Sequence, residues 1–377
     1  MHTHPLSKKI GLFAGPLLFI TVLNYPFDSL SFEAAAVLAT ASWMVSWWIS
    51  EAVSISVTAL LPLIIFPLTG VMAVNDVGAN YGSSIVFLFF GGFVLALGLE
   101  KVNLHRRIAL TIIKKTGTSP NKVILGFMIA TAFMSMWISN TASTVVMLPI
   151  ALSVINLLID QQESSTKQTR NFALSVMLGI AFSANAGGIA TVIGTPPNSV
   201  LIGLLENEYQ IQISFVKWMA IGLPFAIVMI TIIYLVLVYG MFSTKGLQFS
   251  VSQEVIDNEL EKLGPIKPKE KQVLWVFGIV VSLWIFRTLI NSVLPGLKLS
   301  DTVISILGAV ALFAIPFDLK KGDFILEWKD TQKLSWGILI LFGGGLALAK
   351  GMSATGIVSL ITTYIANGNF SILLTAS

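Results

Sequence analysis

The stretch Trp137–Pro149 reads WISNTASTVVMLP and separates two apolar runs, Val123–Trp137 and Val145–Ile159. Each run, as a helix of about 15 residues, is roughly 22 Å long. That is shorter than the roughly 20 residues that cross a bilayer. Two short helices joined at a polar, uncharged tip predict a re-entrant hairpin. Bare backbone at membrane depth is tolerated only where it is buried in protein or lines a watery cavity. We therefore expect the tip, residues 139–141, to face a cavity that holds something polar.

The composition of the whole chain is that of a multi-spanning membrane protein. Of its 377 residues, 55% are hydrophobic and 11% are charged, against about 25% charged in ordinary soluble domains. The mean hydropathy is +0.84. The sequence contains no cysteine, which excludes disulfide scaffolds, thiolate metal sites and thiol catalysis. Two of the three histidines, His2 and His4, lie at the N-terminus, and His105 lies in a basic stretch. No histidine metal site or catalytic triad is therefore expected.

The apolar segments predict an all-α polytopic fold. They lie near residues 8–24, 33–50, 53–72, 83–99, the hairpin 121–159, 171–203, 217–242, 272–294, 302–318 and 336–350. The first segment resembles the first half of a signal peptide, but no small-residue cleavage pattern with a soluble mature part follows it. We expect this segment to be retained as a membrane helix.

Lysine and arginine predict the orientation of these segments. They are concentrated in residues 100–122, 243–271 and 319–335, and they are sparse in residues 73–82, 204–216 and 295–301. The positive-inside rule places the N-terminus and all three basic stretches in the cytoplasm. The number of crossings between the stretches agrees with this placement. The net charge of +4 is thus explained by membrane orientation, and no nucleic-acid partner is expected.

An internal repeat is visible in the apolar segments. Residues 84–98 read SIVFLFFGGFVLALG, and residues 336–350 read WGILILFGGGLALAK. Each copy is followed by a more polar, helix-like stretch, residues 100–116 and residues 351–366. The first of these stretches, with its interleaved basic side chains, predicts a helix lying on the membrane surface. The charge pattern predicts that the two copies cross in opposite directions, as in many secondary carriers. The Gly-Gly pairs alone are equally consistent with close helix packing.

A second break is predicted in residues 183–199, which read SANAGGIATVIGTPPNS inside an apolar segment. Proline cannot continue a helix but suits the first positions of a new one. We therefore expect the helix to break near Gly194–Thr195 and a new helix to begin at Pro196-Pro197. A simple proline kink is the alternative. Two interrupted elements in one half favour a binding site in which helix N-termini face an anion and unwound carbonyls surround Na⁺.

The hairpin tip has matching chemistry. Asn140 and Thr141 are expected to cap a helix that begins near Ala142, whose N-terminus carries partial positive charge. Free carbonyls are expected where the preceding helix ends. A plain tight turn, in which Ser and Asn favour the turn, is the alternative.

Arg287 is the one charged residue expected near mid-membrane, where it snorkels or pairs within the scaffold. The sequence offers no buried carboxylate for a bound ion. The oxygens that remain are those of hydroxyl, amide and carbonyl groups, and these suit Na⁺ better than a proton or a transition metal.

Four stretches together resemble the divalent anion/sodium symporter family of dicarboxylate carriers. They are WWISEAVSISVTALLPLIIFPL (Trp47–Leu68), FLFFGGFVLALGLEK (Phe87–Lys101), AFMSMWISNTASTVVMLPIA (Ala132–Ala151) and GGIATVIGTPPN (Gly187–Asn198). The stretches occur in the order that the family has, and the similarity spans nearly the whole chain. The resemblance implies a scaffold domain, a transport domain that moves as an elevator, and a homodimer in the inner membrane.

The resemblance also implies particular site residues. Ser135, Ser139, Asn140 and Gly194 would bind Na⁺, and Asn140 and Thr141 would contact a substrate carboxylate, with Ser139 beside them. Thr195 and Pro196, at the second helix start, are further expected substrate contacts. The family has a second Ser-Asn-Thr tip, which would follow the segment that starts near Asn369. We therefore expect the chain to be truncated within its second repeat.

The predicted domains follow from these features. Residues 1–116 hold the first-repeat scaffold helices and the interfacial helix, and residues 117–242 hold the transport-domain hairpin, broken helix and following span. Residues 243–271 form a cytoplasmic linker, residues 272–366 the second-repeat scaffold helices, and residues 367–377 the start of the truncated second hairpin.

The predicted function is sodium-coupled uptake of C4-dicarboxylates such as succinate, malate and fumarate, with membrane lipid around the carrier. A sodium-independent dicarboxylate exchanger, or a carrier of citrate, sulfate or another anion, is the alternative on the same fold. A channel would need a carbonyl filter or a charged ring, and the sequence shows neither. An enzyme would need a nucleophile with a base or a metal, and none stands near Ser139. We therefore predict a transporter and not an enzyme.

Overall fold

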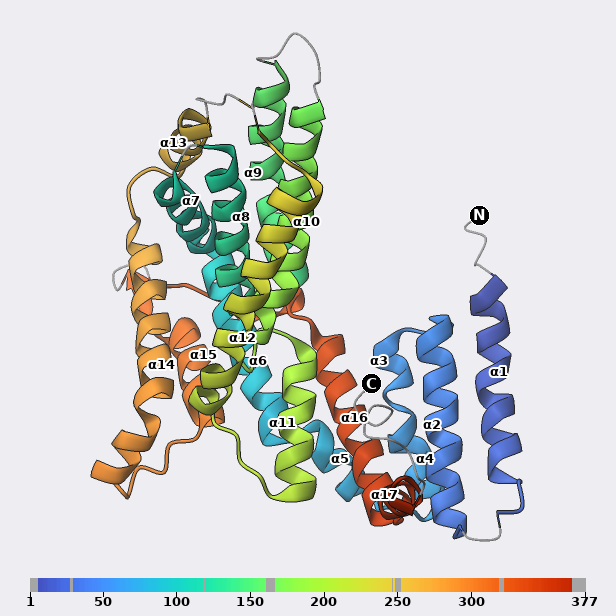
Figure 1. Cartoon of the computed structure of the whole chain (residues 1–377). Helices are drawn as coiled ribbons and strands as arrows, with labels where there is room; N and C mark the ends of the chain where they lie inside the picture. The colour runs from blue at the N-terminus through green and yellow to red at the C-terminus, as the bar shows by residue number, and fades with distance from the viewer. Residues whose placement is uncertain are drawn as a thin grey trace. The chain divides into compact units, whose positions relative to one another are not determined.

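The structure is a computed structural model that describes residues 6–27, 30–117, 119–160, 167–245, 247, 252–318 and 322–367. These residues form helices almost throughout (Figure 1). By their contacts they divide into two compact units. Unit 1 comprises Met1–Val86, Val200–Gln212 and Ser335–Ser377, and unit 2 comprises Phe87–Ser199 and Ile213–Leu334.

Unit 1 is built from the helices at the two ends of the chain. Its elements are α1 (Leu6–Leu23), α2 (Phe32–Ser50), α3 (Ile55–Thr58), α4 (Leu61–Thr69), α5 (Val74–Tyr81), most of α11 (Pro196–Tyr209), α16 (Trp336–Ala354) and α17 (Ile357–Asn367). Glycines bring α16 close to its neighbours. A Cβ on Gly343 would lie 2.3 Å from the Tyr81 ring, and one on Gly344 would lie 2.2 Å from the Ala59 carbonyl. The packing role considered for this Gly-Gly pair is thus confirmed.

Unit 2 contains the predicted hairpin and the first half of the broken helix. Its elements are α6 (Ser84–Lys101, from Phe87 on), α7 (Leu104–Thr116), α8 (Pro120–Ser135), α9 (Asn140–Asp160), α10 (Lys167–Ile189), the start of α11, α12 (Phe215–Leu235), a π-helical turn (Val236–Met241), α13 (Ser252–Leu263), α14 (Pro268–Val293), α15 (Asp301–Ala314), β1 (Pro316–Asp318), β2 (Asp323–Phe324) and a 3-10 turn (Trp328–Lys333). The two strands pair antiparallel, with Pro316 opposite Phe324.

The core of unit 2 lies around α8. Ile124, Phe127 and Met128 of this helix are completely buried, and Phe172 of α10 and Ile113 of α7 pack in the same cluster. A helix that is apolar on all sides is expected inside a protein or a membrane. The helix α8 therefore lies in the centre of this cluster and packs against α7, α9, α10 and α12.

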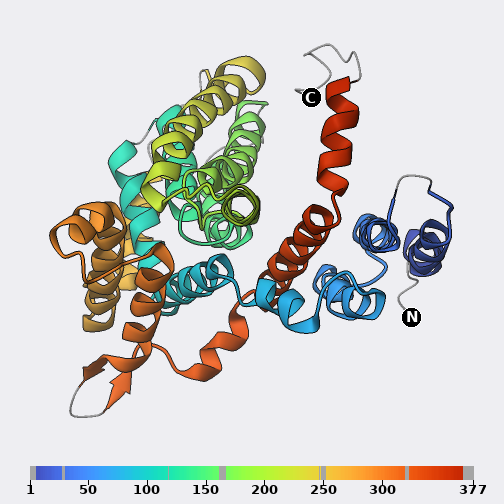
Figure 2. The same cartoon turned by 90° about the horizontal axis from the view of Figure 1, so that it is seen from below.

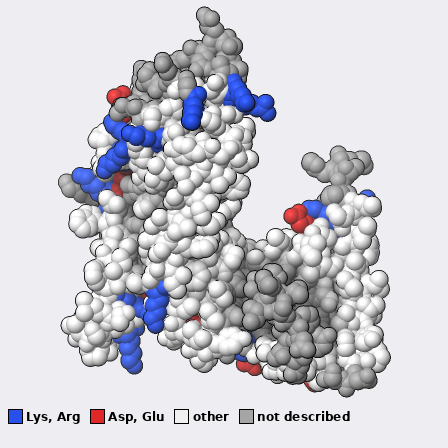
Figure 3. All heavy atoms as spheres, in the orientation of Figure 1, with Lys and Arg blue, Asp and Glu red and all other residues white. Residues whose placement is uncertain are grey.

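The helices are long and apolar enough for a membrane protein. Among the described residues, seven helices qualify as candidate spans: Leu6–Leu23, Phe32–Ser50, Val74–Lys101, Lys167–Ile189, Phe215–Met241, Pro268–Val293 and Trp336–Ala354. On the face of unit 2 seen in Figure 3, Lys and Arg side chains gather toward its two ends, with a broad uncharged band between them. The predicted all-α polytopic fold is confirmed.

Three expectations about individual segments need correction. The segment 53–72 is not one span, because α3 and α4 are separated at Ala59–Leu60 and the apolar part, Ile55–Thr69, is too short. The segment 302–318 ends as helix at Ala314, because Pro316 begins a strand. The second hairpin arm, α9, has 21 residues instead of about 15, although its apolar part ends at Asn156.

The predicted linker 243–271 also contains structure. Its helix α13 packs against α7 through ion pairs between Arg106 and Glu259 and between Lys114 Nζ and Asp257 Oδ1, the latter at 2.7 Å. Glu259 also accepts a hydrogen bond of 2.6 Å from Lys262 Nζ, and this contact, together with Arg106, lowers the pKa of its carboxyl. Charged side chains of residues 243–271, the stretch predicted to be cytoplasmic, therefore form ion pairs with α7 within unit 2.

The two copies of the repeat have the same order of elements. In each copy a residue in the left-handed region follows shortly after the end of a long helix: Asn103, with φ of 58°, after α6, and Gly356, with φ of 75°, after α16. A shorter helix follows, α7 in the first copy and α17 in the second. Figure 2 shows the change of direction between α16 and α17. A second hairpin tip would lie beyond the described residues, and the segment expected to start it, residues 369–377, also lies outside them.

Candidate functional site

The turn between α8 and α9 carries the first group of predicted site residues. The helix α8 ends at Ser135, and α9 begins at Asn140, two residues earlier than expected. Ser139 caps α9, because its Oγ accepts a hydrogen bond of 3.2 Å from the Ala142 backbone nitrogen. The expected capping by Asn140 and Thr141 is thus wrong. Since Ser139 supplies the cap, the Asn140 side chain is available for other contacts.

Asn140 uses its amide to connect three helices. Its Oδ1 accepts a hydrogen bond of 2.6 Å from Ser135 Oγ, at the end of α8. Its Nδ2 donates a hydrogen bond of 3.0 Å to Asn185 Oδ1, in α10. Ser135 is completely buried, whereas Asn185 is exposed. The Asn140 side chain therefore lies where the hairpin meets the helix that is about to break.

The predicted break in the second element is present and is wider than expected. The helix α10 ends at Ile189, and α11 begins at Pro196. Asn198, in the first turn of α11, donates from Nδ2 to the carbonyls of Gly188 at 3.0 Å and Thr191 at 2.8 Å. These contacts satisfy part of the backbone that unwinding leaves unpaired. The break is thus a built feature with its own hydrogen bonds, and not a simple proline kink.

Gly188 is the point where the two interrupted elements meet. A Cβ on Gly188 would lie 2.5 Å from Asn140 Oδ1 and 3.2 Å from the Gly194 carbonyl oxygen. A Cβ on Gly194 would lie 2.4 Å from the Gly188 carbonyl oxygen. Only glycine permits such an approach. The hydroxyl of Thr191, within the break, also donates to the carbonyl of Met136 in the hairpin turn.

The structure thus brings together three of the four residues expected to bind Na⁺. Ser135 contacts Asn140 directly, and Gly194 lies across Gly188 from Asn140. Ser139, the fourth, is exposed and supplies the α9 cap. The oxygens are hydroxyl, amide and carbonyl oxygens, which suit a hard cation. Among the described residues, no group of three or more His, Cys, Asp or Glu side chains is placed to hold a metal.

The residues expected to contact the substrate lie at two helix starts. Ser139 and Thr141 are exposed beside the start of α9, and Thr195 and Pro196 are half-buried at the start of α11. Within the described part of the chain, no hydrogen bond joins Thr141 to Thr195 or Pro196. Each helix start leaves backbone N–H groups without an intrahelical partner. Both starts can therefore offer donors to an anion.

Sequence reasoning missed the contacts that three residues make in this arrangement. They are Asn185, Gly188 and Asn198, which all lie within residues 183–199. Polar amides in an otherwise apolar segment were the available signal. Asn185 contacts Asn140 of the hairpin, and Asn198 contacts the Gly188 carbonyl across the break in the helix. The sequence could not indicate these partners, because they are brought together by the folding of the chain.

Comparison with known proteins identifies the family. A family model described as the sodium:sulfate symporter transmembrane region matches residues 8–371. The chain belongs to the divalent anion/sodium symporter family. Two similar relatives are both named sodium-dependent dicarboxylate transporter SdcS, from Staphylococcus aureus strains bovine RF122 / ET3-1 and USA300. Each is 42% identical over 356 residues, covering 93% of this chain and 68% of the relative.

This membership settles the class of protein. The divalent anion/sodium symporters and these relatives are transporters and not enzymes, as predicted. Together with the seven apolar helices among the described residues, it identifies a multi-pass plasma-membrane protein. The roles of individual residues in binding Na⁺ and substrate remain predictions. The geometry around Asn140 indicates which substitutions test them.

Proposed function

We propose that the chain forms a carrier that couples Na⁺ entry to the uptake of C4-dicarboxylates such as succinate, malate and fumarate. The observation that carries this proposal is the uncharged oxygen cluster around Asn140. The Asn140 amide oxygen lies 2.6 Å from Ser135 Oγ. Gly188 lies beside this oxygen, since a Cβ added at Gly188 would be 2.5 Å from it, and the Gly194 carbonyl is also close to Gly188. The names of the relatives supply the ion and the class of substrate.

In this proposal Na⁺ binds first, among the oxygens of Ser135, Ser139, Asn140 and Gly194. Because none of these groups carries a charge, the bound ion makes the site positive. The dianion then binds at the helix starts, near Ser139, Asn140 and Thr141 on one side and Thr195 and Pro196 on the other. The partial positive charge of each helix N-terminus stabilises a carboxylate there.

The carrier architecture is part of the same proposal. We assign residues 117–242 to a moving transport domain and residues 1–116 and 272–366 to the scaffold. We also propose a re-entrant hairpin, elevator-type movement, a homodimer and a cytoplasmic N-terminus. The short apolar arms of the hairpin and the positions of the basic stretches support these assignments.

The test is succinate uptake by Asn140→Asp protein in proteoliposomes with an imposed Na⁺ gradient. The new carboxylate places a like charge beside the substrate, and we expect uptake at low succinate to fall by about a hundredfold, the size of effect that misplaced binding groups produce. Asn171→Asp is the matched control, because Asn171 donates to the Ser243 carbonyl, away from the tip. Unchanged Na⁺-driven uptake by Asn140→Asp would contradict the proposal.

Competition distinguishes the substrates that the fold could carry. Unlabelled succinate, malate and fumarate should each compete with labelled succinate, whereas sulfate and citrate should not. Stronger competition by sulfate or citrate would favour a carrier of those anions, a possibility that the description of the matching family raises. Uptake that is equal with and without Na⁺ would favour sodium-independent exchange.

A further inference from the structure

An ion pair lies at the start of α15, in unit 2. Asp301 Oδ1 is 2.9 Å from an Arg287 guanidinium nitrogen in α14, and the two side chains are 12% and 24% exposed. Of the two arrangements that the sequence allows for Arg287, snorkelling or pairing, the structure shows pairing. Arg287 lies in an apolar candidate span, where a charged side chain is costly unless it is paired. The proposed function gives this pair no role.

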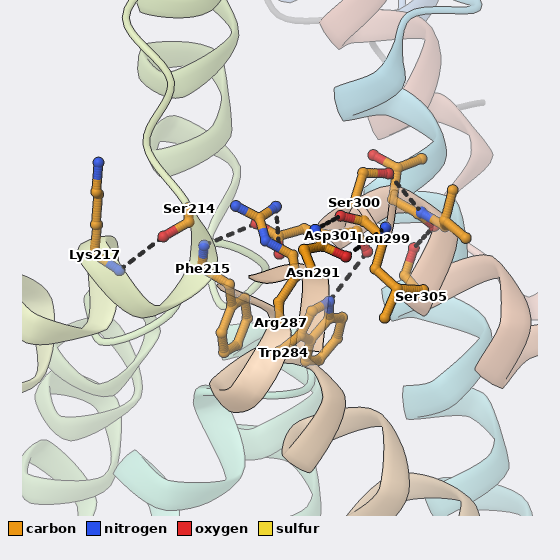
Figure 4. Close-up of polar contacts among 12 residues, drawn as sticks. Ser214, Phe215, Lys217, Trp284, Arg287, Asn291, Leu299, Ser300, Asp301 and Ser305 are labelled. Carbon is orange, nitrogen blue, oxygen red and sulfur yellow. Dashed lines mark hydrogen bonds and ion pairs between the residues drawn. The ribbon is translucent and has the colours of Figure 1, made fainter. Parts of the chain in front are cut away.

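Asp301 also contacts a further element, α12, and makes a second contact with α14 (Figure 4). Its Oδ2 accepts a hydrogen bond of 2.8 Å from the backbone nitrogen of Phe215, the first residue of α12. Its backbone carbonyl accepts a hydrogen bond of 3.0 Å from Trp284 Nε1, in α14. A carboxylate at a helix start satisfies an unpaired N–H and complements the helix dipole. Asp301 therefore holds the starts of α12 and α15 and the C-terminal part of α14 together.

A column of aromatic rings leads from this point to the hairpin turn. The ring of Phe215 is stacked on that of Trp284, with centroids 4.4 Å apart and an interplanar angle of 15°. The ring of Trp137 follows, 6.2 Å from Phe215 at an angle of 23°. All three side chains are buried, with exposed fractions of 1% for Trp284, 0% for Phe215 and 8% for Trp137.

Trp137 belongs to the turn that carries the site. It stands two residues before Ser139 and three before Asn140, and its ring also meets that of Phe277 in α14, with centroids 4.9 Å apart. Closely packed interiors transmit displacements, because neighbouring groups have little room to yield. A shift of the Phe215 ring is therefore expected to displace the turn that ends at Ser139, directly before Asn140 begins α9.

We propose that Asp301 is a positioning residue of the carrier. It fixes Phe215 at the start of α12, and the stacked rings of Trp284, Phe215 and Trp137 hold the hairpin turn in the place where Asn140 contacts Ser135. The effect on Na⁺ and substrate rests on the proposed function, whereas the effect on the turn does not. Binding sites of this kind need their groups held within about 0.5 Å.

The first measurement is the Na⁺ dependence of succinate uptake by the full chain in proteoliposomes. Asp301→Ala removes the acceptor for Phe215, and we expect the half-saturating Na⁺ concentration to rise about tenfold, with a smaller change in maximal rate. Asp301→Asn keeps an acceptor and should show a smaller rise. Phe215→Leu should resemble Asp301→Ala, and the double variant should be no worse than the more severe single variant, because both act through one column.

The matched control is Asn291→Ala. Asn291 lies in the same region and binds both the nitrogen and the carbonyl oxygen of Leu299, at 2.9 Å and 2.8 Å, but it has no contact with Phe215. A general loosening of this end of α14 would affect both variants equally. An Asn291→Ala effect as large as that of Asp301→Ala, or additive effects of Asp301→Ala and Phe215→Leu, would overturn the proposal.

The second measurement needs no substrate. Because the chain has no cysteine, Ile138→Cys places a single thiol in the hairpin turn, at a position that is 2% exposed. Its rate of reaction with a maleimide reports how often the turn opens. We expect Asp301→Ala and Phe215→Leu to raise this rate about tenfold, and Asn291→Ala to leave it unchanged.

An unchanged thiol reaction rate in Asp301→Ala would overturn the proposal. If the unmodified chain shows no Na⁺-dependent uptake, the proposed function fails, but a raised thiol rate still supports the role of Asp301 in holding the turn. The amount of protein that elutes as a single species in detergent shows that each variant is folded.

Discussion

At the scale of single residues, Asn140 and Gly188 depend on each other. The amide of Asn140 reaches Ser135 on one side and Asn185 on the other, and Gly188 leaves the space in which its oxygen lies. A side chain at position 188 would meet both that oxygen and the carbonyl of Gly194. Sequence reasoning selected Asn140 and Gly194, and the structure adds the glycine that lets them approach.

Gly188→Ala is the residue-scale prediction that follows. The added methyl group would lie 2.5 Å from Asn140 Oδ1, so the amide must move away from Ser135. We expect the half-saturating Na⁺ concentration for uptake to rise by about tenfold or more, equivalent to about 1.4 kcal/mol of lost ion binding. A Na⁺ titration of succinate uptake measures this change.

Gly278→Ala provides the control for this substitution. A Cβ on Gly278, in α14, would meet no atom within 4 Å. Alanine is also the better helix former, so we expect uptake at every Na⁺ concentration to match that of the parent. An equal rise in the two variants would show that the Gly188 contact has no specific role.

At the scale of elements, α13 and α7 form a charged contact outside the predicted spans. Glu259 interacts with both Arg106 and Lys262, and its side chain is 11% exposed. The helix α13 of the predicted linker therefore packs against α7. Charge composition indicated that this stretch is cytoplasmic but could not indicate its partner, because the two helices are far apart in the sequence.

We predict that Glu259→Gln lowers the stability of unit 2 by about 1 kcal/mol at pH 7. Hydrogen bonding to Lys262 and the charge of Arg106 lower the pKa of Glu259 in the folded protein. Its charge thus stabilises the fold above its unfolded pKa of about 4.3, and this contribution is lost as the pH falls through the lower, folded pKa.

Thermal unfolding in detergent at pH 7 and near pH 4 measures this effect. The difference in apparent Tm between the parent and Glu259→Gln should be present at pH 7 and smaller at the lower pH. Glu261→Gln, an exposed position on the same helix, should show little difference at either pH. A difference that grows on acidification would contradict the assignment of this ion pair.

At the scale of the whole molecule, the basic stretches predict which ends of the helices face the cytoplasm. Lys115, at the end of α7, and Lys298, between α14 and α15, lie in stretches assigned to opposite sides. Both residues are exposed. Since the chain contains no cysteine, a single thiol at either position reports its side without interference.

We predict that Lys298→Cys reacts with a membrane-impermeant maleimide added outside whole cells. Lys115→Cys should react only after the membrane is made permeable, because the positive-inside rule places residues 100–122 in the cytoplasm. Fluorescence of the labelled band on a gel measures both reactions. Labelling of both positions from the outside would contradict the predicted orientation.

The sequence by itself determined the class of fold and the positions of the two interruptions. Apolar content, the polar tip at residues 139–141 and the proline pair after Gly194 are local features, and each acts on the backbone where it stands. The breaks before Asn140 and before Pro196 were accordingly predicted to within a few residues. The family also followed from such local stretches.

Only the tertiary structure decided which side chains meet. Ser139 caps α9, Asn140 turns to Ser135 and Asn185, and Arg287 pairs with Asp301. For the cap of α9, for example, Ser139, Asn140 and Thr141 are all residue types that cap helices. The choice among them depends on the packing of helices that are distant in the sequence, and local propensity carries no information about that packing.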